Sequence, residues 1–263
     1  MTEWQIDGTP LQDKRRGWRV DGESLIPYPP TRAVELVEVP FLDGATPVPG
    51  GMQPTVLTIR VFVESGKPGS FDLLLDRQAD FYRLVQEGEW LTFVGDKRQK
   101  REARILRAIV SQPERAGWCG VFLTTEFTLA PYWRDPDLHT VTVPLSGGSG
   151  QRVQLEPFRD STAPLVDAVI TVSGPFTRLQ LDAGDTGVTV EARTAAGETA
   201  VIDCRDHSVT VAGKRVAFDY PGGGFLKIPA ATVGDPYPVV TATVAGVDRS
   251  YSKLTVEGHT WFL

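Results

Sequence analysis

The sequence predicts a protein made mainly of β-strands and divided into two domains. Short alternating apolar segments recur along nearly the whole chain, as at residues 55–63 (TVLTIRVFV), which is the pattern of half-buried strands. Glycine and proline number 26 and 20 among 263 residues, enough to place a turn between successive strands. Only one segment, residues 71–88, has the apolar spacing of a helix.

The composition excludes several classes of protein. Hydrophobic residues at 41% and charged residues at 23% are typical of a globular chain, and exclude a disordered protein, a collagen, a coiled coil and a disulfide-stapled miniprotein. No apolar stretch approaches the roughly 18 residues of a membrane helix. The N-terminus has no basic region followed by an apolar run, so we expect no secretory signal and synthesis in a cytoplasm.

The charge distribution argues against nucleic-acid binding as the main function, and the cysteine content argues against a disulfide-rich fold. The net charge of −6 is spread over both halves, whereas a protein that grips nucleic acid usually has a basic domain. Cys119 and Cys204 are isolated in the sequence. They imply no disulfide framework, although the sequence leaves open a single bond between them.

The first half is predicted to hold several strands and an unusual loop. The strand at 33–39 (AVELVEV) runs into the segment 40–51, whose prolines cannot donate to a β-ladder and whose glycines permit positive φ, so we predict a loop there. A hairpin is expected at 90–94 and 103–110. The remaining strands of this half are predicted at 55–63, 121–129 and 140–143.

The one predicted helix covers residues 71–88. Leu74, Phe81, Leu84 and Val85 recur at three- and four-residue steps and mark its apolar face. Ser70 or Asp72 is expected to cap its start, and Gly88 to adopt the left-handed conformation past its end.

The second half reads as strands throughout. Turn signals return about every eight to twelve residues, which predicts a β-sandwich or jelly roll. The domain change is expected between Pro144 and Pro164, giving domains 1–150 and 151–263; the segment 146–150 is either a hairpin turn or a linker. The strands of this half are predicted at 168–172, 179–181, 188–190, 200–203, 209–211, 216–218, 225–228, 239–244 and 251–256.

No set of residues in the sequence assembles a catalytic or metal centre. His139, His207 and His259 lack metal-ligand spacing and are interpreted as surface or turn residues. The segments 203–207 (DCRDH) and 135–137 (DPD) could supply a metal or nucleophile site, but Asp and Asp-Pro in these settings favour turns. We therefore expect no enzyme, no catalytic residue, no cofactor and no metal.

Two basic clusters allow two interpretations. One is Lys14–Arg16 with Arg19, and the other is the run 97–101 at the tip of a predicted hairpin. They could face a passing nucleic acid. We favour solvated charges or salt bridges between subunits, and the second cluster would also discourage edge-to-edge pairing of strands.

Six tryptophans in a β-rich chain raise the alternative of carbohydrate binding, because sugars stack on exposed aromatic faces. Trp4 and Trp18 lie in segments that look loosely structured. The other four are expected in the core or an interface: Trp90, Trp118, Trp133 and Trp261.

The order of motifs resembles the distal tail (Dit) proteins of bacteriophages with long, non-contractile (siphovirus-type) tails. The resemblance spans nearly the whole chain, and no single motif carries it. In the first half it rests on Gly8, the strand 34–39 running into 40–44 (PFLDG), the lone helix near 72–87, and 127–133 (FTLAPYW). In the second half it rests on 162–164, 200–203 leading to 209–211, and the Gly-rich turn before 225–229 (FLKIP). The chain departs from many relatives at Phe41 and Leu42, where they carry a Gly-Arg pair.

The resemblance implies a fold and a structural role without catalysis. It implies an N-terminal β-sandwich or split-barrel domain with one α-helix, which forms a ring, and a C-terminal galectin-like β-sandwich (jelly roll). It implies a homohexameric baseplate hub at the virion's tail tip that binds the major tail tube protein, the tape measure protein and the tail-tip or baseplate proteins. DNA would pass only as cargo, and no membrane would be involved.

A closed ring needs two different complementary faces on each subunit. The Pro/Gly-rich loop is long and apolar, and loops of that kind tend to be functional, so we expect it to contact a neighbouring subunit or the tube. The predicted contact residues are Phe41, Leu42, Asp43, Gly44, Pro47, Pro49, Gly50 and Gly51. The alternative function, a carbohydrate-binding β-sandwich for host-cell adhesion, requires an exposed aromatic platform on the C-terminal domain.

Overall fold

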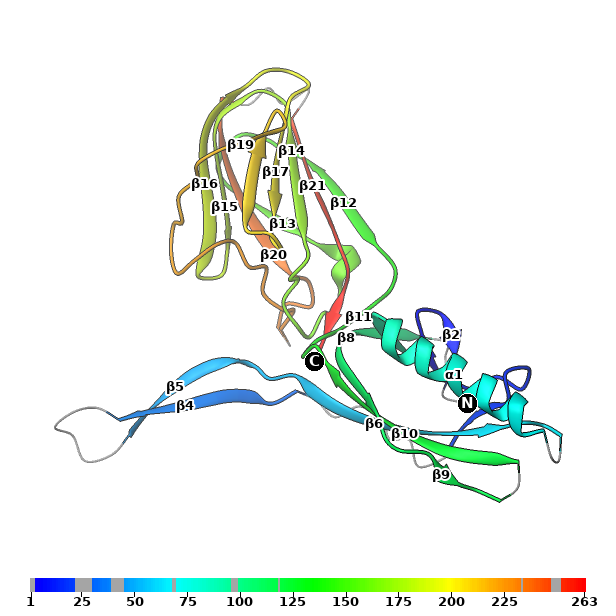
Figure 1. The fold of residues 1–263 in the computed structure, drawn as a ribbon. Coiled ribbons are helices and arrows are strands. Elements are labelled where there is room, and N and C mark those ends of the chain that lie inside the picture. Colours follow the sequence, from blue (N-terminus) through cyan, green and yellow to red (C-terminus); the bar gives the residue numbers. More distant parts are fainter. Residues whose placement is uncertain are drawn as a thin grey trace. The chain divides into compact units, whose positions relative to one another are not determined.

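The structure is a computed structural model that describes residues 3–21, 30–38, 45–67, 70–95, 99–117, 119–232, 234–246 and 252–263, with the backbone alone at 34–38, 45–50 and 149. The chain divides into two compact units, Met1–Trp133 with Leu263, and Arg134–Phe262 (Figure 1). The described residues are mainly in β-strands and form a single α-helix, α1 (Phe71–Glu87), and one 3₁₀ turn, η1 (Glu156–Phe158). The prediction of a mainly β fold with one helix is therefore confirmed.

The first unit is built on an antiparallel sheet with the strand order β2-β1-β7-β8-β10-β6-β3, with β9 beside β10. The predicted hairpin is confirmed, since β7 pairs with β8 in a register that sets Trp90 opposite Arg104. The strands of this sheet are β1 (Glu3–Ile6), β2 (Thr9–Pro10), β3 (Trp18–Val20), β6 (Thr55–Glu64), β7 (Trp90–Val94), β8 (Lys100–Val110), β9 (Glu114–Arg115) and β10 (Gly120–Leu129). The short strand β11 (Trp133–Arg134) spans the division between the units.

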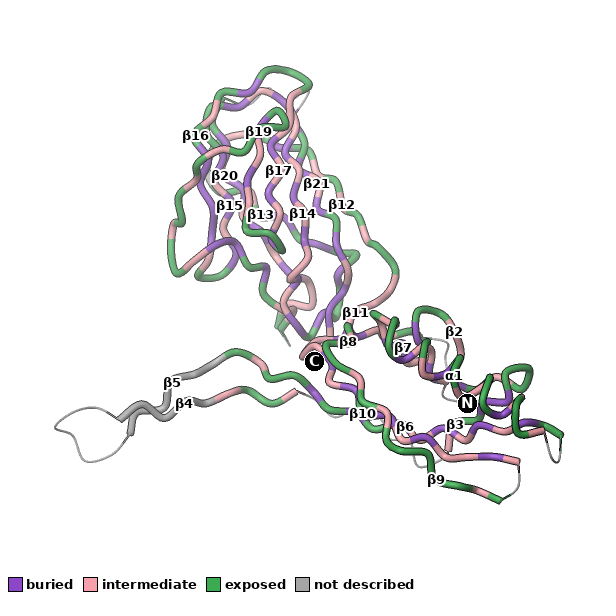
Figure 2. Tube along the Cα trace, viewed as in Figure 1, coloured by how far each residue is buried: buried purple, intermediate pink, exposed green. Residues whose placement is uncertain are grey.

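Helix α1 covers one face of this sheet. Alternate residues of β6 are buried there, and Leu74, Phe81 and Val85 of α1 pack over them (Figure 2). Trp18 is fully buried against the edge of Phe81, with ring centroids 5.5 Å apart, and its indole N–H donates to the Arg77 carbonyl at 3.2 Å. These contacts form the core of the unit, and the predicted apolar face is confirmed except that Leu84 is only half-buried.

The ends of α1 differ from the prediction. Ser70 makes no side-chain capping bond, and Gly88 has φ −69° rather than a left-handed conformation. Gly88 is required for a different reason. A Cβ there would collide with the side chain of Ile6 on β1, so the glycine allows strand and helix end to approach closely.

Most of the predicted Pro/Gly-rich loop is a strand. β4 (Arg32–Glu38) and β5 (Ala45–Met52) form an antiparallel ribbon in which Arg32 faces Met52 and Leu36 faces Pro47 (Figure 1). Pro47 and Pro49 are two residues apart, so their nitrogens face the same edge of β5. A two-stranded ribbon leaves one edge of each strand open, where residues that cannot donate are tolerated. The loop prediction is therefore wrong for residues 45–51.

The second unit is a sandwich of two antiparallel sheets. One has the order β12-β21-β14-β17-β18-β19 and the other β13-β20-β15-β16. Alternate residues of both sheets are buried, among them Ile170 and Val256 in the first and Leu181 and Val240 in the second (Figure 2). The strands are β12 (His139–Pro144), β13 (Gly148–Gln154), β14 (Val169–Ser173), β15 (Phe176–Ala183), β16 (Thr186–Thr194), β17 (Thr199–Asp203), β18 (Ser208–Val211), β19 (Lys214–Arg215), β20 (Val239–Ala245) and β21 (Lys253–Gly258), with β22 (Trp261–Phe262) at the end.

The units divide after Trp133, earlier than the sequence suggests. β12 pairs with β21 and β13 pairs with β20, so residues 139–154 contribute to both sheets of the sandwich. Gly147 lies between β12 and β13 and has a positive φ, as do Gly148 and Gly150 at the start of β13, where the register with β20 shifts. Of the two interpretations of this stretch, the structure shows the turn.

Two predicted strands are absent from the second unit. Residues 216–218 and 225–228 are in no strand, and isolated bridges, Thr189 with Asp219 and Leu165 with Ile228, tie this segment to its neighbours. The segment includes residues 221–224 (PGGG) and three further prolines, which interrupt backbone donation along a ladder. It forms an irregular crossing from β19 to β20.

Candidate assembly and binding surfaces

The two Asp-containing segments form turns, as their sequences indicate. The Asp203 carboxylate accepts the backbone N–H groups of Arg205 and Asp206 at 2.9 and 3.1 Å. The Asp135 carboxylate accepts the N–H of Asp137 at 3.0 Å. Within the described part of the chain, no three His, Cys, Asp or Glu side chains are grouped to hold a metal ion.

The histidines have three different environments. The ring of His139 meets the edge of Phe158, and the exposed His207 stacks on Phe225 with centroids 5.0 Å apart. His259 is largely buried, so its interpretation as a surface or turn residue is wrong. Its Nδ1 lies 2.5 Å from an Asp167 oxygen.

Asp167 is the centre of a buried polar cluster that no local sequence pattern marks. Its other oxygen accepts the indole N–H of Trp261 at 2.7 Å, and the Arg134 guanidinium lies 3.9 Å away. Burial acts to raise the pKa of this carboxyl, but the hydrogen bonds from His259 and Trp261 together outweigh burial and hold the pKa below 3.8. Residues from both ends of the second unit's sequence thus meet at one carboxylate.

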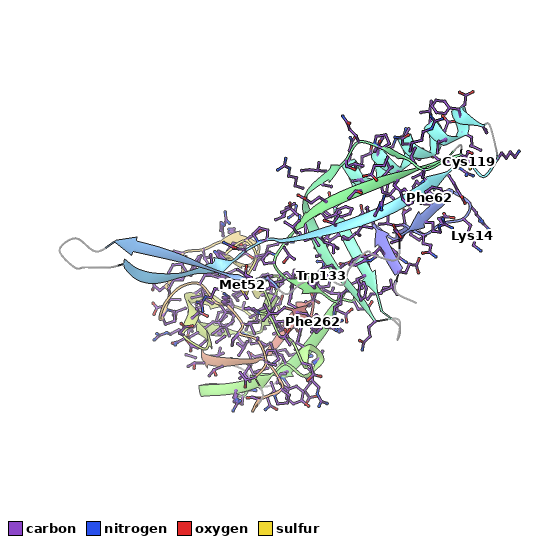
Figure 3. All side chains as sticks on the ribbon, turned by 90° about the horizontal axis from the view of Figure 1, so that it is seen from below. Lys14, Met52, Phe62, Cys119, Trp133 and Phe262 are labelled. Atoms are coloured by element: carbon purple, nitrogen blue, oxygen red, sulfur yellow. The ribbon has the colours of Figure 1, made fainter. Side chains whose placement is uncertain are left out.

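The cysteines are free thiols. Cys204 is buried, and burial followed by the nearby charges of Asp203 and Asp167 raises its pKa to about 12. A thiol with this pKa is protonated and unreactive at neutral pH. Cys119 is partly accessible (Figure 3), and the disulfide that the sequence left open does not form.

The first basic cluster is largely engaged within its own unit. Arg16 pairs with Asp13 at 3.5 Å and lies over the Trp18 ring, while Arg19 lies over Phe62. In the second cluster, Lys97 and Arg98 lie outside the described residues. Arg101 donates to the Lys100 carbonyl at 3.2 Å.

The predicted interface residues fall partly within the β4–β5 ribbon. Pro47, Pro49, Gly50 and Gly51 are on β5, whereas Phe41, Leu42, Asp43 and Gly44 lie outside the described residues. At the base of the ribbon, Gln53 donates its N–H to the Thr31 carbonyl at 2.9 Å, close to Met52 (Figure 3). Within the described chain, neither strand of the ribbon pairs with a further strand.

This isolation has an energetic consequence. A two-stranded ribbon alone in water is marginally stable at best, and its open edges are templates for pairing with another chain. Among the described residues, the ribbon thus leaves one open edge on each of its two strands.

A second exposed surface is the face of the first unit's sheet that α1 does not cover. Val56, Leu106 and Ile109 project there and are each about half exposed. Arg60 on the same face pairs with Glu114 at 2.8 Å and lies over Phe122. Thr128 and Glu126 of β10 lie between these strands on the same face, so the face mixes exposed apolar and polar side chains.

The described tryptophans do not form an exposed aromatic platform. Trp4, Trp18, Trp133 and Trp261 are buried, Trp90 is half-buried, and Trp118 lies outside the described residues. Trp4 and Trp18 are in strands β1 and β3, so the expectation that they lie in loosely structured segments is wrong. The large exposed aromatic side chain of the second unit is Tyr220, which is 52% exposed.

Comparison with solved structures shows a similarity of fold. No family model and no curated protein sequence matches the chain. The fold is similar to that of the crystal structure of the SPP1 Dit (gp 19.1) protein, described as a paradigm of the hub adsorption apparatus in phages that infect Gram-positive bacteria. The match covers 100% of both chains with a TM-score of 0.58 and 13% sequence identity. The resemblance to Dit proteins inferred from motif order is thus confirmed at the level of the fold.

Proposed function

We propose that this protein is a structural hub of a phage tail tip, in which copies of the chain form a ring that connects the tail tube to the tail-tip or baseplate proteins. The observation that carries the proposal is the full-length fold similarity to a Dit protein, because it covers both units and their order along the chain. The sequence motifs point to the same family independently of the fold. The role we assign is assembly rather than catalysis.

The β4–β5 ribbon is the element we assign to ring contacts. Its open edges and its lack of a third strand within the described chain favour a neighbour that completes it. The sheet face that carries the exposed side chains of Val56, Leu106 and Ile109 is a candidate for the complementary surface. A ring closes only if two such different faces meet around a rotation axis.

The proposed ring is a homohexamer formed by the first unit, and the second unit is the galectin-like sandwich. Its partners would be the major tail tube protein, the tape measure protein and the tail-tip or baseplate proteins, in the virion and without a membrane. No described helix is long and apolar enough to cross a bilayer. A charge of −6 per chain makes an acidic lumen feasible, through which DNA would pass as cargo without adhering.

The ribbon can be removed with little change to the rest of the unit. Arg32 and Met52 are register partners, so a two-residue Asn-Gly turn replacing residues 33–51 would close the chain between them. We expect this variant to fold and to remain monomeric in size-exclusion chromatography with light scattering, while the unmodified chain forms rings. A control variant in the second unit, Leu138→Ala, alters an exposed apolar residue and should leave rings intact. Rings of the ribbon-deleted variant would refute the assignment of the ribbon.

A further inference from the structure

The second unit contains an open pocket of about 560 Å³ whose wall is an aromatic cluster. Phe225 is buried at its base, with His207 stacked on it at 5.0 Å and Tyr220 meeting it in a T-shaped contact at 6.1 Å. Phe218 holds Tyr220 from a further side at 5.5 Å. The cluster therefore joins a buried ring, Phe225, to a half-exposed ring, Tyr220.

The rim of the pocket is formed in advance of any ligand. The Asp203 turn places His207 at φ 47°, a conformation that a non-glycine residue rarely adopts, and so sets its ring on Phe225. On the opposite rim, Gly223 donates to the Asp185 carbonyl at 2.9 Å, and Lys227 donates its N–H to the Thr186 hydroxyl at 2.9 Å. A ligand would meet fixed groups, which lowers the entropic cost of binding.

The pocket has few polar groups, and the one formally charged side chain of its described lining is the cation Lys227. Lys227 is exposed, and its ammonium forms no ion pair with the described residues. The described lining contains no carboxylate. A phenol, an imidazole and one ammonium beside an aromatic wall can donate several hydrogen bonds, and the ammonium supplies one positive charge.

We propose that this pocket binds an acidic saccharide, a sugar ring that carries a carboxylate or a phosphate. The ring would pack its C–H groups on the open part of Tyr220, whose face carries the negative end of the aromatic quadrupole. The acidic substituent would pair with Lys227, and hydroxyls would bond to His207 and the Tyr220 hydroxyl. The volume lies within the range of small-ligand sites, and the absence of glycine side chains at 222–224 lets a ring approach the backbone.

This site lies wholly within the second unit and does not depend on ring formation. It is also distinct from the sequence signal that first raised carbohydrate binding, since no described tryptophan lines it. A hub with this site would bind an acidic glycan directly, in addition to joining tail proteins.

The test is binding of the purified full-length protein to a printed array of neutral and acidic bacterial polysaccharides, including uronate- and phosphate-containing polymers. We expect binding to acidic glycans, and titration of the strongest should show at least a tenfold loss for Tyr220→Ala and a loss of threefold or more for Lys227→Gln. Tyr220→Phe should retain the stacking and lose less. The matched controls Leu138→Ala and Lys253→Gln, at exposed positions outside the pocket, should bind as the unmodified chain does.

Two results would overturn the proposal: no glycan on the array bound by the unmodified chain, or equal binding by Tyr220→Ala. Binding confined to neutral glycans would refute the role of Lys227 and the acidic class. The ribbon-deleted variant should still bind, so failure of the hub proposal and failure of this one are separable.

Discussion

The indole N–H of Trp261 donates to the Asp167 carboxylate at 2.7 Å, and this bond ties the end of the second unit's sequence to the segment just before β14. His259 approaches the other oxygen of the same carboxylate at 2.5 Å. Charge-assisted hydrogen bonds of this kind are stronger than neutral ones, and their loss in a buried site leaves unpaired donors. We therefore expect the hydrogen bonds of this cluster to stabilise the folded second unit.

Replacement of Asp167 by Asn should destabilise the second unit. The amide keeps the shape but loses the negative charge and one of the two acceptor oxygens that Trp261 and His259 approach. We expect a loss of about 2 kcal/mol in the free energy of unfolding, in the range measured for hydrogen bonds to charged groups. Chemical denaturation, monitored by tryptophan fluorescence, measures this change in the free energy of unfolding. An unchanged midpoint would show that the cluster contributes nothing.

The Asp167 contribution should also depend on pH. The folded pKa lies below 3.8, so the carboxylate contributes its stabilisation above the unfolded pKa, and this is lost as pH falls through the folded pKa. The difference in unfolding free energy between the unmodified chain and Asp167→Asn should shrink as the pH falls from about 5 to below about 4. A difference that grows over this pH range would contradict the sign of the pKa shift.

Two glycines with positive φ should respond differently to Ala. At Gly174 (φ 106°) a Cβ would lie 2.5 Å from the Ser252 hydroxyl and 2.7 Å from its Cα, whereas at Gly197 (φ 88°) it would meet nothing within 4 Å. Gly197→Ala should cost about 1–2 kcal/mol from the backbone alone. Gly174→Ala should cost about 1–3 kcal/mol more because of overpacking. Thermal unfolding of the two variants measures this, and equal melting temperatures would contradict the close approach of Gly174 to Ser252.

The two cysteines should differ in reactivity. Cys204 is buried with a pKa of about 12, so iodoacetamide at pH 8 should leave it unmodified in the native protein. After unfolding in guanidinium it should label fully, and Cys119 supplies the internal reference for partial access. Mass spectrometry of the digested peptides reads both sites. Rapid native labelling of Cys204 would mean that its surroundings open readily.

Secondary structure is predicted best from the sequence where apolar residues recur with one clear period. The strict alternation of residues 55–63 and the three- and four-residue steps of α1 locate β6 and the helix with the correct buried faces. Prediction fails where tertiary partners decide the conformation. Pro47 and Pro49 suggest a loop, but an open ribbon edge accommodates them, and Gly88 is needed for the approach of Ile6 rather than for a left-handed turn.

The candidate sites show the same limit. The segment that could form the ring contact is visible in the sequence as a Pro/Gly-rich run, but its form as a paired ribbon is not. The sequence of residues 225–228 predicts a strand, yet these residues lie in the irregular connection from β19 to β20. This connection brings Phe225 into contact with Tyr220 and His207. Asp167 and His259 are 92 positions apart, so no local pattern announces their contact.

The central claim is that copies of this chain form a ring. The most direct test is the mass of the purified protein in solution by light scattering after size exclusion, with negative-stain images of the peak. We predict a particle of six times the 28.8 kDa chain mass with an open centre. A single species of 28.8 kDa at all concentrations, with no rings in the images, would contradict the claim.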